Sequence, residues 1–382
     1  MPPRPQAAVA QQQQTLDFDA VNESEASIAG ESLDMKHVIE IVGDLLERSP
    51  GIYWLDLLLS AGAAWGLTAV YFAAPAWSAL QIGAFIGASI LFFRAGTFIH
   101  EIIHFPRREM VWFRRVWNLI IGVPLLMPWI FYRNHLDHHS ARFFGTPEDG
   151  EYLPLAAAPV REFVKYLLQA PLLPIMSAAR FLLLTPLSWV HRGLREWVLT
   201  AATAGVSNPY YRKRFPAREE GHLKIVEALC FIYLATLAVL VATGIITGMQ
   251  LFKGYLLLGG ALTLNSVRNL AAHRYGNRGE PMSHIEQVSD SINITGQTWL
   301  TVMLFPVGLR YHALHHLVPS LPYHNLGKAH QRLLEKLPAD SPYHAVNRAS
   351  FFATAAGLWR AALKTTAKDS AIPVWRQQNL SS

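Results

Sequence analysis

Histidine is the residue whose spacing in this sequence points most directly to chemistry. Residues 310–317 read Arg-Tyr-His-Ala-Leu-His-His-Leu, residues 135–139 read His-Leu-Asp-His-His, and residues 100–104 read His-Glu-Ile-Ile-His. Side chains at positions i, i+3 and i+4 of a helix lie on one face, with Cβ atoms about 5–6 Å apart. The three motifs therefore offer eight imidazoles in three clusters with helical spacing.

Clustered imidazoles indicate metal binding, because neutral imidazole is the commonest nitrogen ligand for zinc, copper, iron and nickel. One metal ion takes about four to six ligands, so eight converging imidazoles indicate two metal ions. The chain contains a single cysteine, Cys230, within an apolar run. A disulfide framework and a cysteine-ligated metal centre are therefore both excluded. Any bound metal is expected to be held by histidine.

The composition indicates an integral membrane protein. Of the 382 residues, 51% are hydrophobic and 16% are charged, and the mean hydropathy is +0.19, which is too apolar for a soluble enzyme of this size. Four apolar runs could each span about 30 Å of hydrocarbon: residues 52–74, 78–99, 225–247 and 251–272. We therefore expect an all-α integral membrane fold, with four transmembrane helices as two hairpins and a helical cytoplasmic cap that carries the histidine motifs.

The remaining segments divide the chain into regions. An opening rich in Pro and Gln predicts a disordered tail, and the apolar spacing after it predicts an amphipathic helix on the membrane surface or against the folded domain. Prolines interrupt apolar segments at 116–131 and 163–187, which favours interfacial or re-entrant helices. The predicted organisation is a tail at 1–35, an amphipathic helix at 36–49, a membrane domain at 50–335 and a C-terminal cytoplasmic tail at 336–382.

The basic residues predict the orientation of the chain in the membrane. Arginines and lysines are frequent in the connection at 105–224, whereas the two short loops on the other side offer essentially only Lys253. Because positively charged loops stay in the cytoplasm, we expect a multi-pass protein with the histidine clusters and both termini on the cytoplasmic side. His273, at the end of the fourth span, reaches the same level as a ninth ligand, and Asn269 lies one turn before it.

Together the motifs resemble the membrane fatty acid desaturase family. His-x-x-x-His, two copies of His-x-x-His-His on four spans, and Asn-x-x-x-His at 269–273 match its pattern, and residues 315–326 are similar to the third motif of acyl-lipid members. The resemblance covers about residues 50–335. It implies a non-haem di-iron centre whose ligands are His100, His104, His135, His138, His139, His273, His312, His315 and His316, with Asn269 acting through a bound water.

The resemblance also implies an activity and partners. The family removes two hydrogens from a fatty acyl chain with O2, so we expect O2-dependent desaturation of a lipid-linked acyl chain at two iron ions. The His-Pro-Gly-Gly haem signature of a fused cytochrome b5 does not occur in the sequence. Electrons are therefore expected from a separate carrier, a ferredoxin or a cytochrome b5. The expected partners include membrane lipids and an acyl substrate but no nucleic acid; the motifs leave regiochemistry, chain length and acyl carrier open.

Other activities fit parts of the pattern. The same di-iron scaffold supports a hydroxylase or ketolase of a lipid, sterol or carotenoid chain. Residues 100–104 also match His-Glu-x-x-His, the zinc-protease helix in which Glu is the general base, but that hypothesis leaves the other two motifs unexplained. A metal transporter would need polar ligands inside its spans, whereas these clusters lie at one membrane face.

Charged residues near the motifs are candidates for supporting roles. Arg94 and Arg268 each precede a histidine ligand by one to two turns, and they either reach the membrane interface or bind carboxylates or a lipid head group at the buried edge of the site. The basic cluster at 212–214 could dock an acidic electron carrier. The carboxylates that could orient the imidazole rings are Glu101, Asp137, Glu148, Asp149, Glu286 and Asp290.

Seven histidines lie outside the predicted ligand set. His324, in the tail of the third motif, could donate to a ligand, and His284 could cap a turn. The other five occur singly and are expected to tolerate substitution: His37, His191, His222, His330 and His344.

Overall fold

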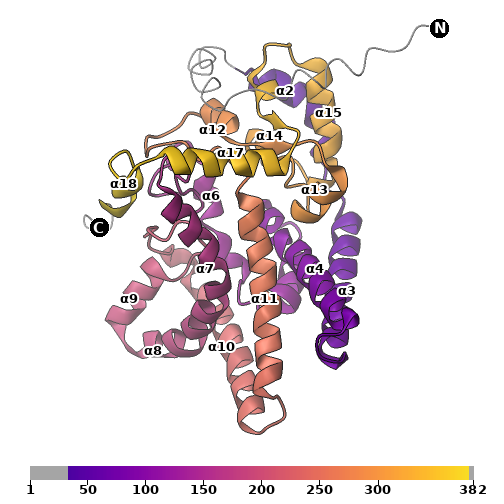
Figure 1. The fold of residues 1–382 in the computed structure, drawn as a ribbon, viewed down its shortest axis with the longest axis vertical. Helices are drawn as coiled ribbons and strands as arrows, with labels where there is room; N and C mark the ends of the chain where they lie inside the picture. Colours follow the sequence, from indigo (N-terminus) through magenta and orange to yellow (C-terminus); the bar gives the residue numbers. More distant parts are fainter. Residues whose placement is uncertain (1–32, 378–382) are drawn as a thin grey trace, which may run out of the picture.

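The chain folds almost entirely into helices, and a computed structural model describes residues 33–377 (Figure 1). The predicted disordered tail lies outside the described residues up to position 32. Long helices descend from a cap of short helices. Within the described range, the single sheet is a parallel pair of two-residue strands, β1 (Asn293–Ile294) and β2 (Asn347–Arg348). The predicted all-α membrane fold with a histidine-bearing cap is confirmed.

Two long helical hairpins form the lower part of the molecule in Figure 1. Polar residues cap these apolar helices: the Ser78 hydroxyl accepts from the Gln81 N–H at one start, and Thr247 and Gln250 form a capping box at another. The second helix packs against both the first and the fourth, which places it at the centre of the bundle. The four helices are α3 (Pro50–Ala73), α4 (Ala79–His104), α10 (Glu220–Ala242) and α11 (Gly248–Asn269).

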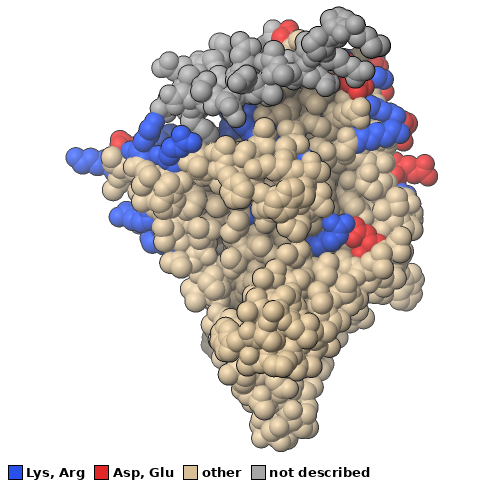
Figure 2. Space-filling model, turned by 45° about the vertical axis from the view of Figure 1, so that its right-hand side comes forward, with Lys and Arg blue, Asp and Glu red and all other residues tan. Residues whose placement is uncertain are grey.

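Four helical segments are long and apolar enough to cross a membrane: Pro50–Ala73, Ala79–His104, Val160–Val190 and Ala217–Ala242. The predicted fourth span, α11, is long enough at 22 residues but is not among them, and it carries the charged Lys253 and Arg268. Figure 2 shows charged side chains gathered around the upper part of the molecule, whereas its tapering lower half carries none on this face. These features make the chain an integral membrane protein.

The other elements are mostly short, except for the run from α7 to α8. The elements between the hairpins are α5 (Val111–Trp117), the π-helical turn η3 (Asn118–Gly122), the 3₁₀ turn η4 (Trp129–Tyr132), α6 (His135–His138), α7 (Val160–Ala179), the π-helical turn η5 (Arg180–Leu184), α8 (Thr185–Val190), α9 (Arg192–Ala201) and the 3₁₀ turn η6 (Ala217–Glu219). The cap contains α12 (His284–Asp290), α13 (Thr298–Leu304), α14 (His312–Leu317), the 3₁₀ turn η7 (Tyr323–Asn325), α15 (Leu326–Lys336), α16 (Pro342–Ala345), α17 (Phe351–Lys364) and α18 (Ile372–Gln377).

The segment from α7 to α9 leaves the histidine end of the molecule and returns to it. After α9, the backbone N–H groups of Ser207 and Asn208 both donate to the carbonyl of Gly150, at 2.9 and 3.0 Å. Gly150 lies in the loop before α7, so both ends of the segment meet. A re-entrant segment requires such a return, whereas a single crossing would separate the two ends by the thickness of the membrane.

The predicted amphipathic helix packs against the folded cap. In the structure this segment forms α2 (Met35–Val42), which is followed by the 3₁₀ turn η2 (Gly43–Leu45). Val38 and Ile41 on its apolar face are buried in one core with Leu333 of α15. Of the two surfaces that the sequence left open for this helix, the structure therefore assigns the folded domain.

The C-terminal region also packs into the fold. Strand β2 lies beside β1 with Asn347 opposite Asn293, and α18 buries Ile372 and Trp375 in one core with Tyr152. Residues well beyond position 335 therefore support the part of the cap that surrounds the histidines.

We expect cysteine labelling to place the two hairpin turns on one side of the membrane and the connection on the other. In a Cys230→Ser background, cysteines at the exposed positions Ala76 and Ile245 should react with an impermeant maleimide from one side only. Cysteines at Arg108 and Arg218 should react from the opposite side, which the positive-inside rule predicts to be cytoplasmic. Reaction of positions 108 and 218 from different sides would contradict the re-entrant path.

Candidate metal centre

Nine histidines from four parts of the chain converge at the cap end of the bundle. Helical spacing places the rings of each motif on one face of its helix, so that α4, α6 and α14 direct their rings into a common space. The ninth ring comes from the loop that follows α11. The contributors are His100 and His104 at the end of α4, His135, His138 and His139 at α6, His312, His315 and His316 on α14, and His273.

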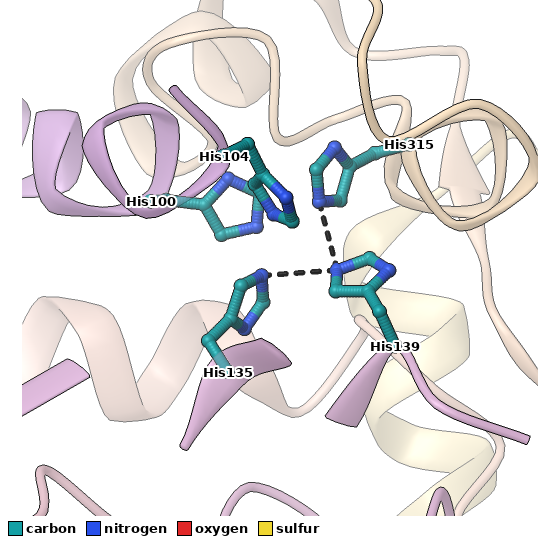
Figure 3. Close-up of side chains that lie close together, drawn as sticks. All are labelled: His100, His104, His135, His139 and His315. Carbon is teal, nitrogen blue, oxygen red and sulfur yellow. Dashed lines mark hydrogen bonds between the residues drawn. The ribbon is translucent and has the colours of Figure 1, made fainter. Parts of the chain in front are cut away.

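Five of these histidines form a group, here named site A: His100, His104, His135, His139 and His315 (Figure 3). One ring nitrogen of each lies within 4.8 Å of one ring nitrogen of every other. The Nε2 atom of His139 is 3.0 Å from Nε2 of His135 and 3.0 Å from Nε2 of His315. The rings of His100 and His104 close the group from the side of α4.

The other four histidines form site B: His138, His273, His312 and His316. The Nε2 atom of His273 is 3.1 Å from Nε2 of His138 and 2.9 Å from Nε2 of His312. The Nε2 atom of His316 is 3.3 Å from that of His312, and all four rings are buried. Adjacent histidines in both His-His pairs go to different sites, so the two sites lie next to each other.

The nitrogen spacing fits a metal ion at the centre of each site. Imidazole nitrogens bind a metal ion at about 2.0–2.1 Å, so two of them at right angles are about 3 Å apart. The Nε2 separations of 2.9–3.3 Å match this value. Both ring nitrogens of His100 and the Nε2 of His104 are buried without a hydrogen-bond partner, which a bound metal would provide.

Burial keeps most of these rings neutral, which is the form that binds metal. Burial and the neighbouring rings hold the pKa of His139, His315 and His316 well below its usual range. His138 is the exception: burial would lower its pKa, but the carboxylates of Asp149, Glu151 and Asp290 together raise it. The lone pairs of the other rings are thus available without the loss of a proton.

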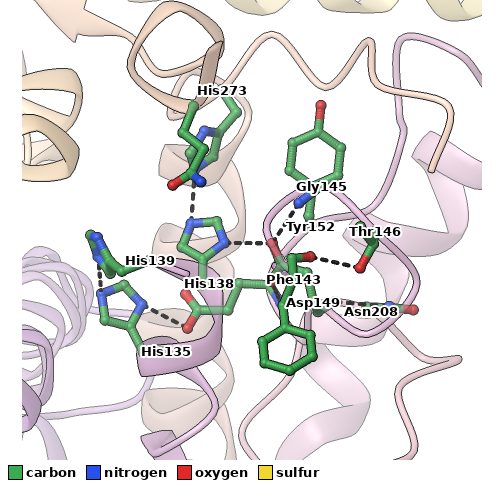
Figure 4. Close-up of polar contacts among 12 residues, drawn as sticks. His135, His138, His139, Phe143, Gly145, Thr146, Asp149, Tyr152, Asn208 and His273 are labelled. Carbon is green, nitrogen blue, oxygen red and sulfur yellow. Dashed lines mark hydrogen bonds and ion pairs between the residues drawn. The ribbon is translucent and has the colours of Figure 1, made fainter. Parts of the chain in front are cut away.

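The loop before α7 supplies two carboxylates that orient the rings of α6 from behind (Figure 4). Asp149 Oδ2 lies 2.8 Å from Nδ1 of His138, and Glu151 Oε1 lies 2.8 Å from Nδ1 of His135. The N–H of Gly145 donates to Asp149 at 3.1 Å, from a backbone with φ of +69° that favours glycine. A carboxylate at Nδ1 fixes the tautomer that presents Nε2 to a metal.

Glu151 is held in its ionised form. Burial would raise its pKa, but the His135 ring and the Tyr132 hydroxyl, which donates to it at 2.7 Å, lower the pKa to about 2. Glu151 is not among the carboxylates predicted from the sequence. A second acidic residue two positions after Asp149, with a glycine between them, was the available signal, because a tight loop can turn both carboxylates toward one motif.

Asp290 and Ser291 hold the ninth histidine. The Nδ1 atom of His273 lies 3.4 Å from Asp290 Oδ2 and 3.2 Å from Ser291 Oγ. The Tyr152 hydroxyl donates to the other oxygen of Asp290 at 3.2 Å. Asp149 and Asp290 are thus the two predicted carboxylates that contact a ring of the sites, and Ser291 is a further contact that the sequence did not single out.

The other predicted carboxylates contact none of these rings in the described structure. Asp137 follows His135 by two positions, so its side chain turns away from the ring face and pairs with Lys213 at 2.8 Å. Glu286 belongs to the capping box at the start of α12. Glu148 is exposed, although it lies next to Asp149.

Glu101 does not occupy the position of a general base. Its carboxylate accepts from the Tyr53 hydroxyl and, at 3.2 Å, from the N–H of Tyr323, and it belongs to neither site. A protease glutamate must instead face the metal from the same helix as the two histidines. The His-Glu-x-x-His hypothesis therefore fails on geometry as well as on the number of histidines.

The other seven histidines stay outside both sites. His324 Nε2 accepts from the Ser49 N–H at 3.2 Å, and His284 Nε2 lies 3.1 Å from the His316 carbonyl. The ring of His191 caps α9. Sites A and B thus contain all nine predicted ligands and no other described histidine.

A cavity leads from the histidines between the long helices. Its polar groups gather at the histidine end, where His100, Tyr132, Glu151, Arg268 and Asn269 line it. About two to three turns further from the cap along α4 and α11, its lining is apolar: Phe92, Phe93, Leu258, Ala261 and Leu262. An apolar lining of this kind suits a hydrocarbon group, and the polar end of the cavity lies beside His100 of site A. A role for Asn269 through a bound water remains a prediction.

The two arginines on the spans have different surroundings. Arg94 pairs with Asp56 of α3, with Nε 2.9 Å from Oδ1, and therefore joins two helices. Arg268 lines the cavity and is buried. In the basic cluster at 212–214, Lys213 pairs with Asp137, and Arg214 pairs with Glu196 and Glu220. Local partners thus neutralise two of the three charges proposed for docking.

Comparison with known proteins agrees with this geometry. The family model for fatty acid desaturases matches residues 75–347. A ceramide hydroxylase from Caulobacter vibrioides (strain NA1000 / CB15N) is 35% identical over 326 residues, which are 85% of this chain and 93% of that protein. No solved structure matches the chain. The chain belongs to the fatty acid desaturase family, whose members are non-haem di-iron membrane oxidoreductases that act on lipids.

We expect the purified protein to contain two metal ions per chain by elemental analysis. His273→Ala should lower the metal content and abolish activity because it removes one of four ligands of site B. His191→Ala should keep both ions, because that ring caps α9. Asn269→Ala should have an intermediate effect on activity, since a second water can replace its contact. Full metal content in His273→Ala, or one tightly bound zinc per chain, would contradict two histidine-held ions.

Glu151→Gln should weaken metal binding at site A by about 10–100-fold, because the neutral amide no longer fixes the His135 tautomer. Metal competition with a chelator measures this change. Glu148→Gln is the matched control, since that side chain is exposed and makes no contact with a ring of the sites. Equal chelator sensitivity of the two variants would show that Glu151 has no role in metal binding.

Proposed function

We propose that this protein uses O2 to hydroxylate the hydrocarbon chain of a ceramide-type lipid, with two iron ions held in sites A and B. The observation that carries the proposal is the pair of buried imidazole groups beside a cavity that is apolar along the long helices. Family membership supports iron and O2 as the reactants at the site. The 35% identity to a ceramide hydroxylase supports both the lipid class and hydroxylation.

The residues of the chain position the reactants and exclude water. Bound iron would supply the oxidising power that an unactivated C–H bond requires. Asp149, Glu151 and Asp290 hold three rings in place, which keeps the ligand geometry fixed. Burial of the site B rings keeps bulk water away. The cavity aligns the lipid chain beside His100.

Desaturation, the activity predicted from the histidine motifs, is the second candidate. Hydroxylation converts a C–H bond, O2, two electrons and two protons into an alcohol and one water. Desaturation takes the same inputs, removes a second hydrogen from the adjacent carbon and yields a double bond and two waters. The position of that second hydrogen decides between them, and the similarity of residues 315–326 to acyl-lipid desaturases favours the double bond.

We further propose that the two electrons come from a separate ferredoxin or cytochrome b5 and reach the site from the cytoplasm. The bias of basic residues toward the connection between the hairpins supports this orientation. Local ion pairs partly neutralise the cluster at 212–214. Basic residues of the connection outside this cluster would then attract an acidic carrier.

Lipid mass spectrometry of an expressing host tests the reaction. We expect ceramides that gain the mass of one oxygen atom, and His316→Ala at matched expression should show none, because it removes a site B ligand. A loss of two hydrogen masses instead would identify desaturation. Oxidation confined to glycerolipids, with ceramides unchanged, would overturn the proposed lipid class.

A further inference from the structure

One buried, positively charged side chain lines the cavity and belongs to neither metal site. Arg268, on the last turn of α11, is 6% exposed and lines the cavity together with Asn265. Its Nη2 donates to Asn265 Oδ1 at 3.1 Å, and its Nε has no hydrogen-bond partner. Arg94, by contrast, forms an ion pair with Asp56. No described carboxylate forms an ion pair with Arg268.

An arginine buried without an ion pair is unfavourable for folding, so its position in the cavity indicates a use. Reaching out to the membrane interface does not account for this side chain, because it is buried and lines the cavity. A guanidinium group has five N–H donors and no acceptor. The hydrogen bond from Nη2 to Asn265 therefore leaves donors for a ligand in the cavity.

We infer that Arg268 and Asn265 bind a carbonyl oxygen of the lipid substrate and thereby hold the first carbons of its chain beside the metal sites. This inference rests on the proposed function and names the substrate group that the site recognises. Asn265 uses its oxygen to accept from Arg268, so its amide N–H groups remain free to donate. Together the two side chains present donors only, which select an acceptor.

The surrounding charge favours a neutral acceptor over an anion. The Glu151 carboxylate lines the same end of the cavity and would repel a carboxylate or phosphate group. An amide carbonyl, the group that joins the two chains of a ceramide, accepts hydrogen bonds without carrying a charge.

The direction of the cavity then sets which carbons are oxidised. From Arg268 to Leu258, α11 extends about 15 Å away from the histidines, and Leu258, Leu262 and Phe92 line that apolar part. A chain held by its carbonyl at Arg268 points its tail along this part. The carbons next to the carbonyl therefore lie beside His100, so oxidation falls close to the polar head and not in the middle of the chain.

The test compares paired lipids that differ only at the carbonyl. We would use N-acyl sphinganine with its thioamide analogue, in which sulfur, a weak acceptor, replaces the carbonyl oxygen, and an ester phospholipid with its ether analogue, in which CH2 replaces the carbonyl. Turnover by the full-length protein and thermal stabilisation in detergent both report on each pair. The wild type should prefer the carbonyl lipid by about 10–100-fold, the range of a charge-assisted hydrogen bond, and oxidise it at one position near the head group.

Arg268→Leu should lose this preference and spread the product over several chain positions, while its metal content stays at the wild-type level. Asn265→Ala and Arg268→Lys should lose part of the preference, and they provide the same comparison if the leucine variant does not accumulate. Arg108→Leu is the control, because it makes the same change at an exposed position that does not line the cavity.

The inference is overturned if Arg268→Leu keeps the wild-type preference and product position, or if the wild type does not distinguish the paired lipids. A different outcome would contradict the proposed function. If phospholipid but not sphinganine lipid is oxidised, the ceramide proposal is wrong, and the ester and ether pair still decides whether Arg268 recognises a carbonyl. If neither is oxidised, thermal stabilisation by the pairs decides it.

Discussion

The convergence of nine imidazole rings on two buried points is the constraint on which the rest of the structure depends. Ring nitrogens about 3 Å apart repel one another unless a proton or a metal ion lies between them. Packing around them must therefore hold the rings in place. Helices meet this need, because a helix fixes the relative positions of side chains one turn apart. Carboxylates behind His135, His138 and His273 hold these three rings further.

The connection between the hairpins provides much of this rigidity. Asp149 and Glu151 hold two rings of α6, and the side-chain amide of Asn208 donates to the carbonyls of Pro147 and Asp149 at 3.2 and 2.9 Å. Asn208 lies just after the re-entrant segment, which thus fixes the loop that orients the ligands. Membrane anchoring and metal geometry are therefore linked through one stretch of backbone.

The same end of the bundle also brings the histidine sites next to the cavity. The cavity starts at His100 and continues between α4 and α11, where its lining becomes apolar. Arg94 is neutralised by Asp56 and stabilises helix packing, whereas Arg268 lies in the cavity near the histidines. Two arginines at similar sequence distances before a histidine of the sites thus have different surroundings, because one has an acidic partner across a helix interface.

The sequence by itself determined the membrane class, the two hairpins and all nine converging histidines, because apolar length and helical spacing are local properties of the chain. Only the tertiary structure decided how adjacent histidines divide between sites A and B, and that Glu151 rather than Glu101 supports a ring. It also decided that α2 packs on α15 and that the segment after α7 returns to Gly150. These features depend on contacts between residues far apart in the chain, and no local pattern of residue types specifies which distant partner a side chain meets.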